Sequence, residues 1–412
     1  MVIMSKLLGS LRYLQNAIES DALQSHKIAF LSGARQAGKT TLAKSILKTH
    51  AVKSAYYTYD DDEFRKLWAK SPKTLLQAGS SKDSGLSLVV LDEIHKDRLW
   101  KNKLKGLYDL FGKQTQFLVT GSARMDYFRR SGDSLQGRYL PYRLHPFTQF
   151  EKDFVKPPPQ THDEWFESKS SESFSRLDLL KLGGFPEPLL GGSEQKAIRW
   201  RRLYQERLVR EDIRDLYDLR NLNQLQTLLL LIKDRAAGQL SYTSLREDLG
   251  TSLDSVLRWV DILESVYFSY RIRPFTVRVK NSLRREPKLY LMDWAGIEDP
   301  GQKWENLIAN HLLKSVQAWT DCAMGEFELH YVRDKQKREV DFLITENGKP
   351  YLLLEVKSGQ AEVTPALIYF NKLLKPKFCF QIVQDKKRER GKTLQNPDIA
   401  VIHADRMLAA LN

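Results

Sequence analysis

The sequence predicts a multidomain α/β protein, and three observations carry that prediction. Near the start of the chain, a glycine-rich segment with a lysine lies between an apolar run and a helical pattern, at residues 28–47. A second apolar run, residues 86–91, ends in two acidic residues. In the C-terminal third, two strand-like segments carry an aspartate and a Glu-x-Lys triplet. Apolar strands alternating with helical patterns are typical of α/β folds with parallel sheets.

Composition and charge limit the class of protein. The chain has 412 residues, which allows two to four domains, and 42% hydrophobic with 28% charged residues is typical of a globular protein. It carries 65 Lys and Arg against 51 Asp and Glu, a formal net charge of +14. This excess favours nucleic acid or another polyanion as a partner, and a solvated basic surface beside a nucleotide pocket is the alternative.

Signals for targeting or cross-linking are missing from the sequence. No apolar run reaches the roughly 18 residues that a membrane span needs, so we expect no membrane partner. The first residues lack the apolar stretch of a secretory signal peptide. Cys322 and Cys379 are the two cysteines, too few for a disulfide framework or a zinc site. A cytoplasmic location is therefore expected.

The glycine-rich segment at residues 33–40 matches the phosphate-binding pattern G-x-x-x-x-G-K-[ST]. Its backbone N–H groups and the N-terminus of the following helix form an anion site. We expect Lys39 to reach the terminal phosphates of a nucleotide and the Thr40 hydroxyl to ligate Mg²⁺. The residues expected to bind nucleotide are Gly33, Ala34, Arg35, Gln36, Ala37, Gly38, Lys39 and Thr40.

Two further strand ends support this site. Asp92 is placed to hold the water shell of the Mg²⁺, and Glu93 is placed to polarise an attacking water as a general base. The next apolar run, residues 116–121, is followed by Ser122. Thr120 or Ser122 is expected to position water or sense the γ-phosphate, and a helix N-cap is the other interpretation of Ser122.

Two more apolar segments, residues 55–59 and 139–144, complete a predicted five-stranded parallel sheet. Phosphoryl transfer often needs an arginine from a neighbouring molecule to neutralise developing charge. Spacing favours Arg138 among the candidates, which are Arg124, Arg129, Arg130 and Arg138.

Together with the segments C-terminal to them, these motifs resemble the AAA-type ATPase module of a large family of bacterial and archaeal proteins. In that family the module is joined to a C-terminal, largely uncharacterised domain of restriction-endonuclease-like fold. The resemblance covers nearly the whole chain and is carried by residues 33–41, 91–95, 119–123, 134–138 and 183–187. It implies Mg-ATP binding and hydrolysis, often in a homo-oligomer such as a hexamer. It also implies that Thr41 belongs to the nucleotide site and that Arg138 is the arginine finger.

The middle of the chain predicts a connector, a helical lid and a winged helix-turn-helix. Residues 199–232 form a long helical pattern expected to cover the nucleotide, and two short helices around Gly250 follow at 240–263. Lid arginines that could reach a phosphate are Arg202, Arg207 and Arg210, although a solvated basic helix face is the other interpretation. The basic residues of the expected wing are Arg271, Arg273, Arg278, Lys280, Arg284 and Arg285. Such a unit contacts DNA or serves as a packing module, and both interpretations stay open because exposed positions such as Asp254 and Asp261 are acidic.

The C-terminal segment resembles PD-(D/E)xK nucleases. Asp341 lies on one predicted strand, and the triplet Glu355-x-Lys357 lies at the end of the next. Glu305 resembles the helical acidic residue found in many of these enzymes. The resemblance implies that Glu305, Asp341 and Glu355 hold Mg²⁺ beside a scissile phosphate. Lys357 would orient or deprotonate water or stabilise developing charge.

The nuclease-like site sets a geometric condition. Glu355 and Lys357 share one face because side chains alternate along a strand. A two-residue turn at Asn347 and Gly348 would pair Asp341 with Leu354, on the wrong face. We therefore predict a three-residue loop, a five-residue loop or a β-bulge, any of which places Asp341 opposite Glu355.

These predictions divide the chain into four parts. They are a P-loop AAA-type ATPase domain at residues 1–150, a connector and helical lid at 151–235, a winged helix-turn-helix at 236–280 and a nuclease-like domain at 281–412. The predicted function is an ATPase with ATP and Mg²⁺ as cofactors that acts on DNA, by remodelling such as branch migration or by cleavage. The alternative is a nucleotide-dependent switch or scaffold for a protein partner, with a catalytically silent C-terminal domain.

Overall fold

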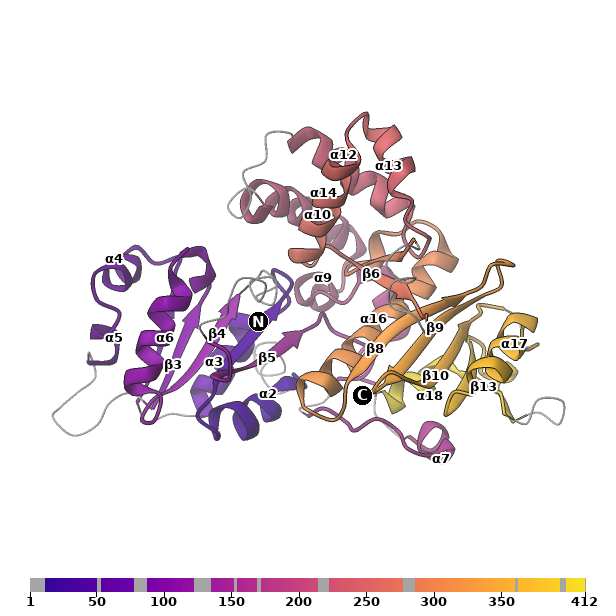
Figure 1. Ribbon diagram of the computed structural model, residues 1–412, viewed down its shortest axis with the longest axis horizontal. Coiled ribbons are helices and arrows are strands. Elements are labelled where there is room, and N and C mark those ends of the chain that lie inside the picture. The colour runs from indigo at the N-terminus through magenta and orange to yellow at the C-terminus, as the bar shows by residue number, and fades with distance from the viewer. Residues whose placement is uncertain are drawn as a thin grey trace.

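The computed structural model describes residues 12–49, 53–77, 87–121, 135–151, 154–168, 172–213, 222–276, 286–359, 362–392 and 398–411. Two β-sheets form the two ends of the elongated molecule, and a group of helices lies above the region between them (Figure 1). No helix in these ranges combines the length and the apolar character that crossing a lipid bilayer requires.

The N-terminal sheet has five strands, all parallel, in the order β2-β3-β4-β1-β5. The strands are β1 (Ile28–Gly33), β2 (Ser54–Thr58), β3 (Leu88–Asp92), β4 (Gln116–Gly121) and β5 (Tyr139–Leu144). The predicted five-stranded parallel sheet is therefore confirmed. Because all five strands run the same way, their carboxyl ends meet at one edge, where ligands bind in such sheets.

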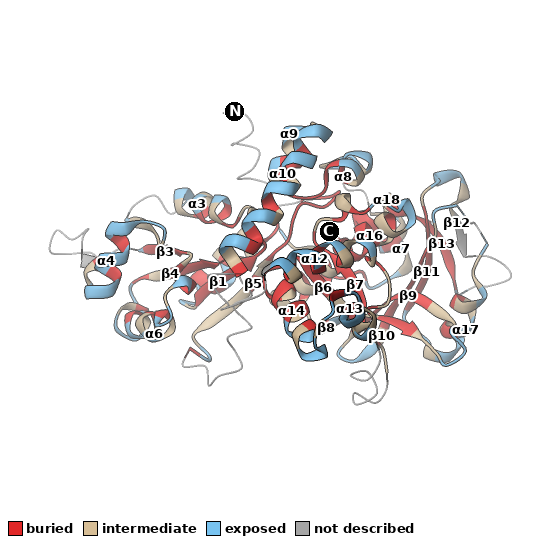
Figure 2. Ribbon diagram, turned by 90° about the horizontal axis from the view of Figure 1, so that it is seen from above, coloured by how far each residue is buried: buried red, intermediate tan, exposed pale blue. Residues whose placement is uncertain are grey.

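Helices cover both faces of this sheet. They are α2 (Leu14–Ala17), η1 (Ile18–Leu23), α3 (Lys39–Thr49), α4 (Asp62–Lys70), α5 (Thr74–Gln77), η2 (Ile94–Lys96) and α6 (Trp100–Phe111). Phe30 packs with Trp100 on one face, whereas Ala29 and Leu31 pack with Leu42 on the other. This alternation along β1 makes the strand buried on both sides, as Figure 2 shows for the inner strands β1, β3 and β4.

The helical region follows a long connector. The connector contains α7 (His162–Phe166), which packs against the C-terminal sheet (Figure 1). The helical region then comprises α8 (Arg176–Leu182), α9 (Pro186–Gly191), α10 (Glu194–Arg207), η4 (Leu208–Ile213), α12 (Leu222–Asp234), α13 (Tyr242–Leu249) and α14 (Leu253–Ser265). The predicted long helix at 199–232 is thus divided, with α10 continuing into the π-helical turn η4. Gly250 ends α13 in the left-handed conformation, and the Ser252 hydroxyl caps α14 by accepting from the Ser255 N–H, as the sequence indicated.

The C-terminal sheet has eight strands in the order β12-β13-β11-β10-β9-β8-β6-β7. They are β6 (Ser269–Pro274), β7 (Lys288–Leu291), β8 (Phe327–Arg333), β9 (Glu339–Glu346), β10 (Lys349–Val356), β11 (Phe378–Val383), β12 (Arg390–Lys392) and β13 (Ala400–His403). The strands expected to form a wing are therefore the edge of this sheet, because β6 pairs with β7 on one side and with β8 on the other.

Helices pack around the C-terminal sheet. They are η5 (Trp294–Gly296), α16 (Pro300–Asp321), α17 (Pro365–Leu374), η6 (Lys386–Arg388) and α18 (Ala404–Ala410). The β9–β10 hairpin fulfils the geometric condition set by the sequence. Its two-residue turn has positive φ at Asn347 (50°) and Gly348 (75°), and a β-bulge follows between Pro350 and Leu352. Beyond the bulge Leu354 pairs with Phe342, which places the next residue, Glu355, opposite Asp341.

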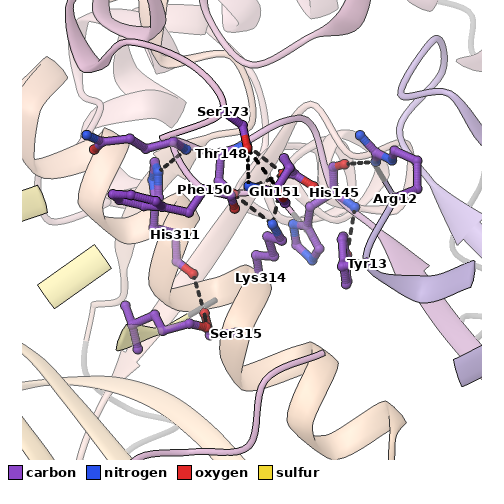
Figure 3. Close-up of polar contacts among 12 residues, drawn as sticks. Arg12, Tyr13, His145, Thr148, Phe150, Glu151, Ser173, His311, Lys314 and Ser315 are labelled. Atoms are coloured by element: carbon purple, nitrogen blue, oxygen red, sulfur yellow. Dashed lines mark hydrogen bonds and ion pairs between the residues drawn. The ribbon is translucent and has the colours of Figure 1, made fainter. Parts of the chain in front are cut away.

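Helix α16 joins the two sheets through a buried polar cluster. The Lys314 Nζ lies 2.8 Å from Glu151 Oε1 and donates to Thr148 Oγ1 at 2.7 Å (Figure 3). The His311 Nε2 accepts from the Gln149 N–H at 3.0 Å, while its Nδ1 lies 2.8 Å from Leu307 O. The segment after β5 is thus held against the helix that supplies Glu305 to the C-terminal site.

Candidate functional site

The phosphate loop lies between β1 and α3, at the carboxyl edge of the N-terminal sheet. Gly33 has φ 155°, and a Cβ there would lie 2.3 Å from Leu144 O, so only glycine fits between the loop and β5. Gln36 and Gly38 also have positive φ, 61° and 100°. Ala34 and Ala37 are buried, and Thr41 is exposed on α3. The loop therefore has the concave backbone that a phosphate site requires.

The Lys39 ammonium is folded back onto its own loop. Its Nζ donates to Gly33 O at 2.9 Å and to Ala34 O at 2.8 Å, and the residue is 5% exposed. Burial lowers the pKa of Lys39, and the carboxylates of Glu93 and Asp92 oppose that shift. A buried ammonium with two backbone carbonyls as partners can exchange them for phosphate oxygens, which fits the role expected of this lysine.

Asp92 stands at the end of β3, beside the loop. Its Oδ2 accepts from the Thr40 hydroxyl at 2.9 Å and from the Tyr56 hydroxyl, and its Oδ1 accepts from the Thr120 hydroxyl. The structure thus brings together Thr40 and Asp92, the two residues expected to hold Mg²⁺. A threonine hydroxyl beside a carboxylate is the oxygen donor set that Mg²⁺ uses in P-loop proteins, so these residues fit the ion.

Tyr56 is a contact that sequence reasoning missed. It lies on β2, next to β3, and its ring also packs under the Lys44 ammonium at 4.6 Å. Thr120 holds Asp92 from the other side, on β4. Its hydroxyl therefore positions the acidic residue, whereas Ser122, the other sensor candidate, lies outside the described residues.

Glu93 follows Asp92 and adopts the left-handed conformation, with φ 58°. This unusual backbone turns the chain sharply at the strand end, as is often found at functional sites. The His95 Nε2 lies 3.7 Å from Glu93 Oε2, and burial lowers the pKa of His95. The imidazole is therefore neutral near pH 7.

Arg35 connects the phosphate loop to the helical region. Its Nη2 lies 2.6 Å from Glu211 Oε2, and its Nη1 lies 2.8 Å from Asp212 Oδ1, both on η4. Burial raises the pKa of Asp212, while Arg35 opposes the shift. The exposure of Arg202, Arg207 and Arg210 agrees with the interpretation of a solvated basic helix face. Two carboxylates of η4, not these arginines, contact the loop through Arg35.

The predicted arginine finger lies far from the loop of its own chain. Arg138 precedes β5, and its carbonyl accepts from the Ile28 N–H at the amino end of β1, whereas Gly33 ends that strand. The Arg138 Nε lies 2.8 Å from Asp109 Oδ1. Arg138 can therefore act only on the nucleotide of another copy. Arg124, Arg129 and Arg130 lie outside the described residues.

The C-terminal domain brings its predicted residues to one face of the sheet. The Asp341 Oδ2 accepts from the Val356 N–H at 2.9 Å, and the Lys357 Nζ lies 2.7 Å from Glu355 Oε1. Burial and the neighbouring Asp341 carboxylate raise the pKa of Glu355 to about 7. The same two causes raise the pKa of Glu305 to about 7. These shifts arise because several carboxylates share a poorly solvated space.

A second lysine, which sequence reasoning missed, lies among these carboxylates. The Lys288 Nζ lies 3.0 Å from Glu305 Oε1, 2.8 Å from Glu339 Oε1 and 3.4 Å from Asp341 Oδ1. Tyr290, two residues along β7, donates its hydroxyl to Glu305 Oε1 at 2.8 Å. Burial opposes the shift, but the three carboxylates raise the pKa of Lys288, so it is charged.

The expected three-carboxylate metal site is therefore not assembled. Across the described ranges, no group of three or more His, Cys, Asp or Glu residues is arranged to hold a metal ion. Lys288 separates Glu305 from Asp341, which is the physical reason for this correction. Glu355 remains buried, with Oε2 lacking a hydrogen-bond partner among the described residues.

The structure also differs from the DNA-contacting surface expected at the basic wing. Arg271, counted as part of a basic wing, points inward, with its Nη2 2.6 Å from Asp261 Oδ1 and in contact with Glu264. Arg273 is exposed. The remaining predicted wing residues, Arg278, Lys280, Arg284 and Arg285, lie outside the described residues. Asp261 and Glu264 on α14 are thus paired with a cation from within the protein.

Comparisons with known protein families match three consecutive parts of the chain. Residues 25–152 match the profile of a family described as an AAA domain. Residues 175–296 and 300–400 match two domains of unknown function, DUF8612 and DUF4143. Glu305, Asp341 and Glu355 lie in the last of these matches, whereas Lys288 precedes it.

Proteins similar in sequence are uncharacterised. One from Mycobacterium tuberculosis is 25% identical over 352 residues, covering 80% of this chain and 70% of that protein. One from Methanocaldococcus jannaschii is 23% identical over 421 residues, covering 92% of this chain and 85% of that protein. One from Haemophilus influenzae is 22% identical over 299 residues, covering 68% of this chain and 70% of that protein.

Two solved structures are similar at low TM-score. A Walker-type ATPase of Pyrococcus abyssi has a TM-score of 0.42 and 14% identity, covering 69% of this chain and 93% of its own. The Holliday junction branch migration motor RuvB of Thermotoga maritima has a TM-score of 0.31 and 16% identity, and the match covers 66% of this chain and 95% of RuvB. The family match and the parallel sheet with its phosphate loop identify the N-terminal domain as a P-loop domain of the AAA type.

Proposed function

We propose that this protein binds Mg-ATP in the N-terminal domain and hydrolyses it. The observation that carries the proposal is the contact of Thr40 with Asp92, next to the buried Lys39 ammonium and the Glu93 carboxylate. These are the groups that phosphoryl transfer needs at one place, because the reaction depends mainly on positioning and charge neutralisation.

Each residue has a distinct part in this proposal. The loop N–H groups and Lys39 bind the phosphates, and Thr40 and Asp92 would hold Mg²⁺, which supplies charge neutralisation when bound. Glu93 accepts the proton of the attacking water. Tyr56 and Thr120 fix the Asp92 carboxylate, so that it is oriented before nucleotide arrives.

Nucleotide binding also has a consequence for the helical region. The Asp212 carboxylate is largely buried and is linked to the loop through Arg35. Phosphate groups entering the loop compete for Arg35 and repel Asp212. We propose that this exchange moves η4, so that the helical region reports which nucleotide is bound.

We further propose that hydrolysis is coupled to nucleic acid, with DNA as the expected partner. The supporting features are the formal net charge of +14 and the grouping of Asp341, Glu355 and Lys357 on one face of the C-terminal sheet. Remodelling such as branch migration, and strand cleavage at the C-terminal site, are the two activities this arrangement suggests.

A nucleotide-dependent switch with a catalytically silent C-terminal domain is the second candidate. The position of Lys288 among the carboxylates favours it, since an ammonium already lies where a metal would bind. In either case we expect a homo-oligomer, such as a hexamer, in which Arg138 of one copy reaches the nucleotide of another.

The ATPase proposal is tested with three purified proteins. The wild type should hydrolyse ATP, Lys39→Ala should fail to bind nucleotide, and Glu93→Gln should bind ATP but lose about 10²-fold or more in turnover. Binding is measured with a fluorescent ATP analogue and turnover by phosphate release. Undiminished hydrolysis by Glu93→Gln would refute the assignment of the general base.

A further inference from the structure

Lys288 is a buried charge in the C-terminal domain site. It lies on β7 at the edge of the sheet, faces α16 and β9, and is 4% exposed. An ammonium group has three N–H donors. Lys288 directs them to three carboxylates, those of Glu305, Glu339 and Asp341, at 3.0, 2.8 and 3.4 Å.

The ammonium and a metal ion cannot both occupy this position. A divalent cation such as Mg²⁺ binds carboxylate oxygens at roughly 2.0–2.1 Å. The oxygens that Glu305 and Asp341 would offer, Oε1 and Oδ1, are those that already face the Lys288 Nζ. An ion between them would lie within roughly 3 Å of the ammonium, where the two positive charges repel strongly.

Neighbouring groups hold Lys288 in place. The Tyr290 hydroxyl donates to Glu305 Oε1 at 2.8 Å, so this oxygen accepts two hydrogen bonds. The Arg333 Nη1 lies 2.6 Å from Glu339 Oε2 and fixes the second carboxylate. Because β7 pairs with β6 through its backbone, the Cα of Lys288 is held at the edge of the sheet, from which its side chain reaches the carboxylates.

We propose that the Lys288 ammonium takes the place of a divalent cation between Glu305 and Asp341, so that Glu305 does not ligate a metal in the wild-type protein. This inference concerns the C-terminal site of the proposed function, and it does not depend on ATP hydrolysis. A cation that enters this domain is expected to use Glu355, whose Oε2 is buried without a partner among the described residues.

The inference is tested by measuring how tightly the full-length chain binds Mn²⁺ in the absence of nucleotide. Binding is detected as a loss of the EPR signal of free Mn²⁺. We expect Glu305→Gln to change the Mn²⁺ affinity of the wild type less than twofold. Lys288→Met should gain a site that binds Mn²⁺ at least tenfold more tightly than the wild type. The double variant Lys288→Met/Glu305→Gln should lose that gain.

Lys314→Met is the matched control, since Lys314 is also a buried lysine paired with a carboxylate, Glu151. It should gain no Mn²⁺ site. A tenfold loss of wild-type Mn²⁺ binding in Glu305→Gln would overturn the inference, as would a Lys288→Met protein that folds and gains no site. If Lys288→Met does not fold, the comparison of the wild type with Glu305→Gln decides alone. Because no nucleotide is present, these results are independent of the ATPase test.

Discussion

The buried pair of Glu151 and Lys314 gives a prediction about what holds the two sheets together. The Glu151 and Lys314 side chains are 0% and 4% exposed, and their charged atoms lie 2.8 Å apart. Glu151 Oε1 also accepts from the Thr148 N–H at 2.8 Å. Removing one partner of such a pair leaves the other charge buried, which costs about 3–5 kcal/mol.

We therefore expect Lys314→Met and Glu151→Gln each to lower the free energy of unfolding by about 3–5 kcal/mol. The double variant removes both charges and should lose less than the sum, by about 2 kcal/mol or more. Urea unfolding of the full-length chain, followed by circular dichroism, measures all four proteins.

The exposed pair of Arg202 and Glu206 is the control. Its atoms lie 3.8 Å apart and its side chains are 79% and 48% exposed, so Arg202→Met should change the unfolding free energy by less than about 0.5 kcal/mol. Single substitutions of Lys314 or Glu151 that cost no more than this control would refute the reasoning. Additive losses in the double variant would do the same.

Three more predictions concern the nucleotide loop and the helix α16. Arg138→Ala should lower ATP turnover only at protein concentrations where the chain assembles, which a dilution series of the ATPase rate measures; an equal loss in monomers would contradict action between copies. Asp212→Asn should raise the affinity for ATP about tenfold, since it removes a negative charge within roughly 10 Å of the phosphates. A fluorescence titration measures this affinity, and weaker binding would contradict the exchange proposed at Arg35. Burial lowers the pKa of His145 and of His311 to about 3. In the unfolded chain each imidazole has a pKa of about 6.5, so below that pH only the unfolded chain takes up these protons. The free energy of unfolding should therefore fall towards acid by up to about 1.4 kcal/mol per pH unit for each imidazole. His311→Gln should reduce that slope in urea unfolding from pH 6.5 to 4.5, and an unchanged slope would contradict this account.

The sequence predicted those parts of the fold and site that depend on local spacing. The loop at 33–40 is bounded by its strand and helix, so its conformation follows from neighbouring residues. Asp92 meets Thr40 because Asp92 stands at the carboxyl end of a parallel strand and Thr40 stands at the loop beside that edge of the sheet. The sequence required a longer loop or a β-bulge in the β9–β10 hairpin because one face of the sheet must carry both Asp341 and Glu355, but it did not distinguish the bulge from the longer loops.

The remaining features depend on contacts between distant segments. Arg35 and Asp212 are 177 positions apart, and nothing in the helical pattern at 199–232 indicates which face meets the loop. Lys288 enters the carboxylate cluster because β7 adds to the edge of the C-terminal sheet, a pairing that depends on β6. A lysine in a short apolar segment gives no sign of such a partner, since exposed lysines are far more common.

The central claim is that ATP hydrolysis is coupled to nucleic acid. We would measure ATP hydrolysis by the wild type, Glu93→Gln and Lys357→Ala with no DNA and with duplex, single-stranded and branched DNA, and follow strand integrity in the same tubes. We expect hydrolysis that depends on Glu93, rises when DNA is added and weakens as salt is raised. Cutting lost in Lys357→Ala would place a cleavage activity in the C-terminal domain, and stimulation without cutting would indicate remodelling. Hydrolysis that no DNA changes would contradict the claim and favour the nucleotide-dependent switch.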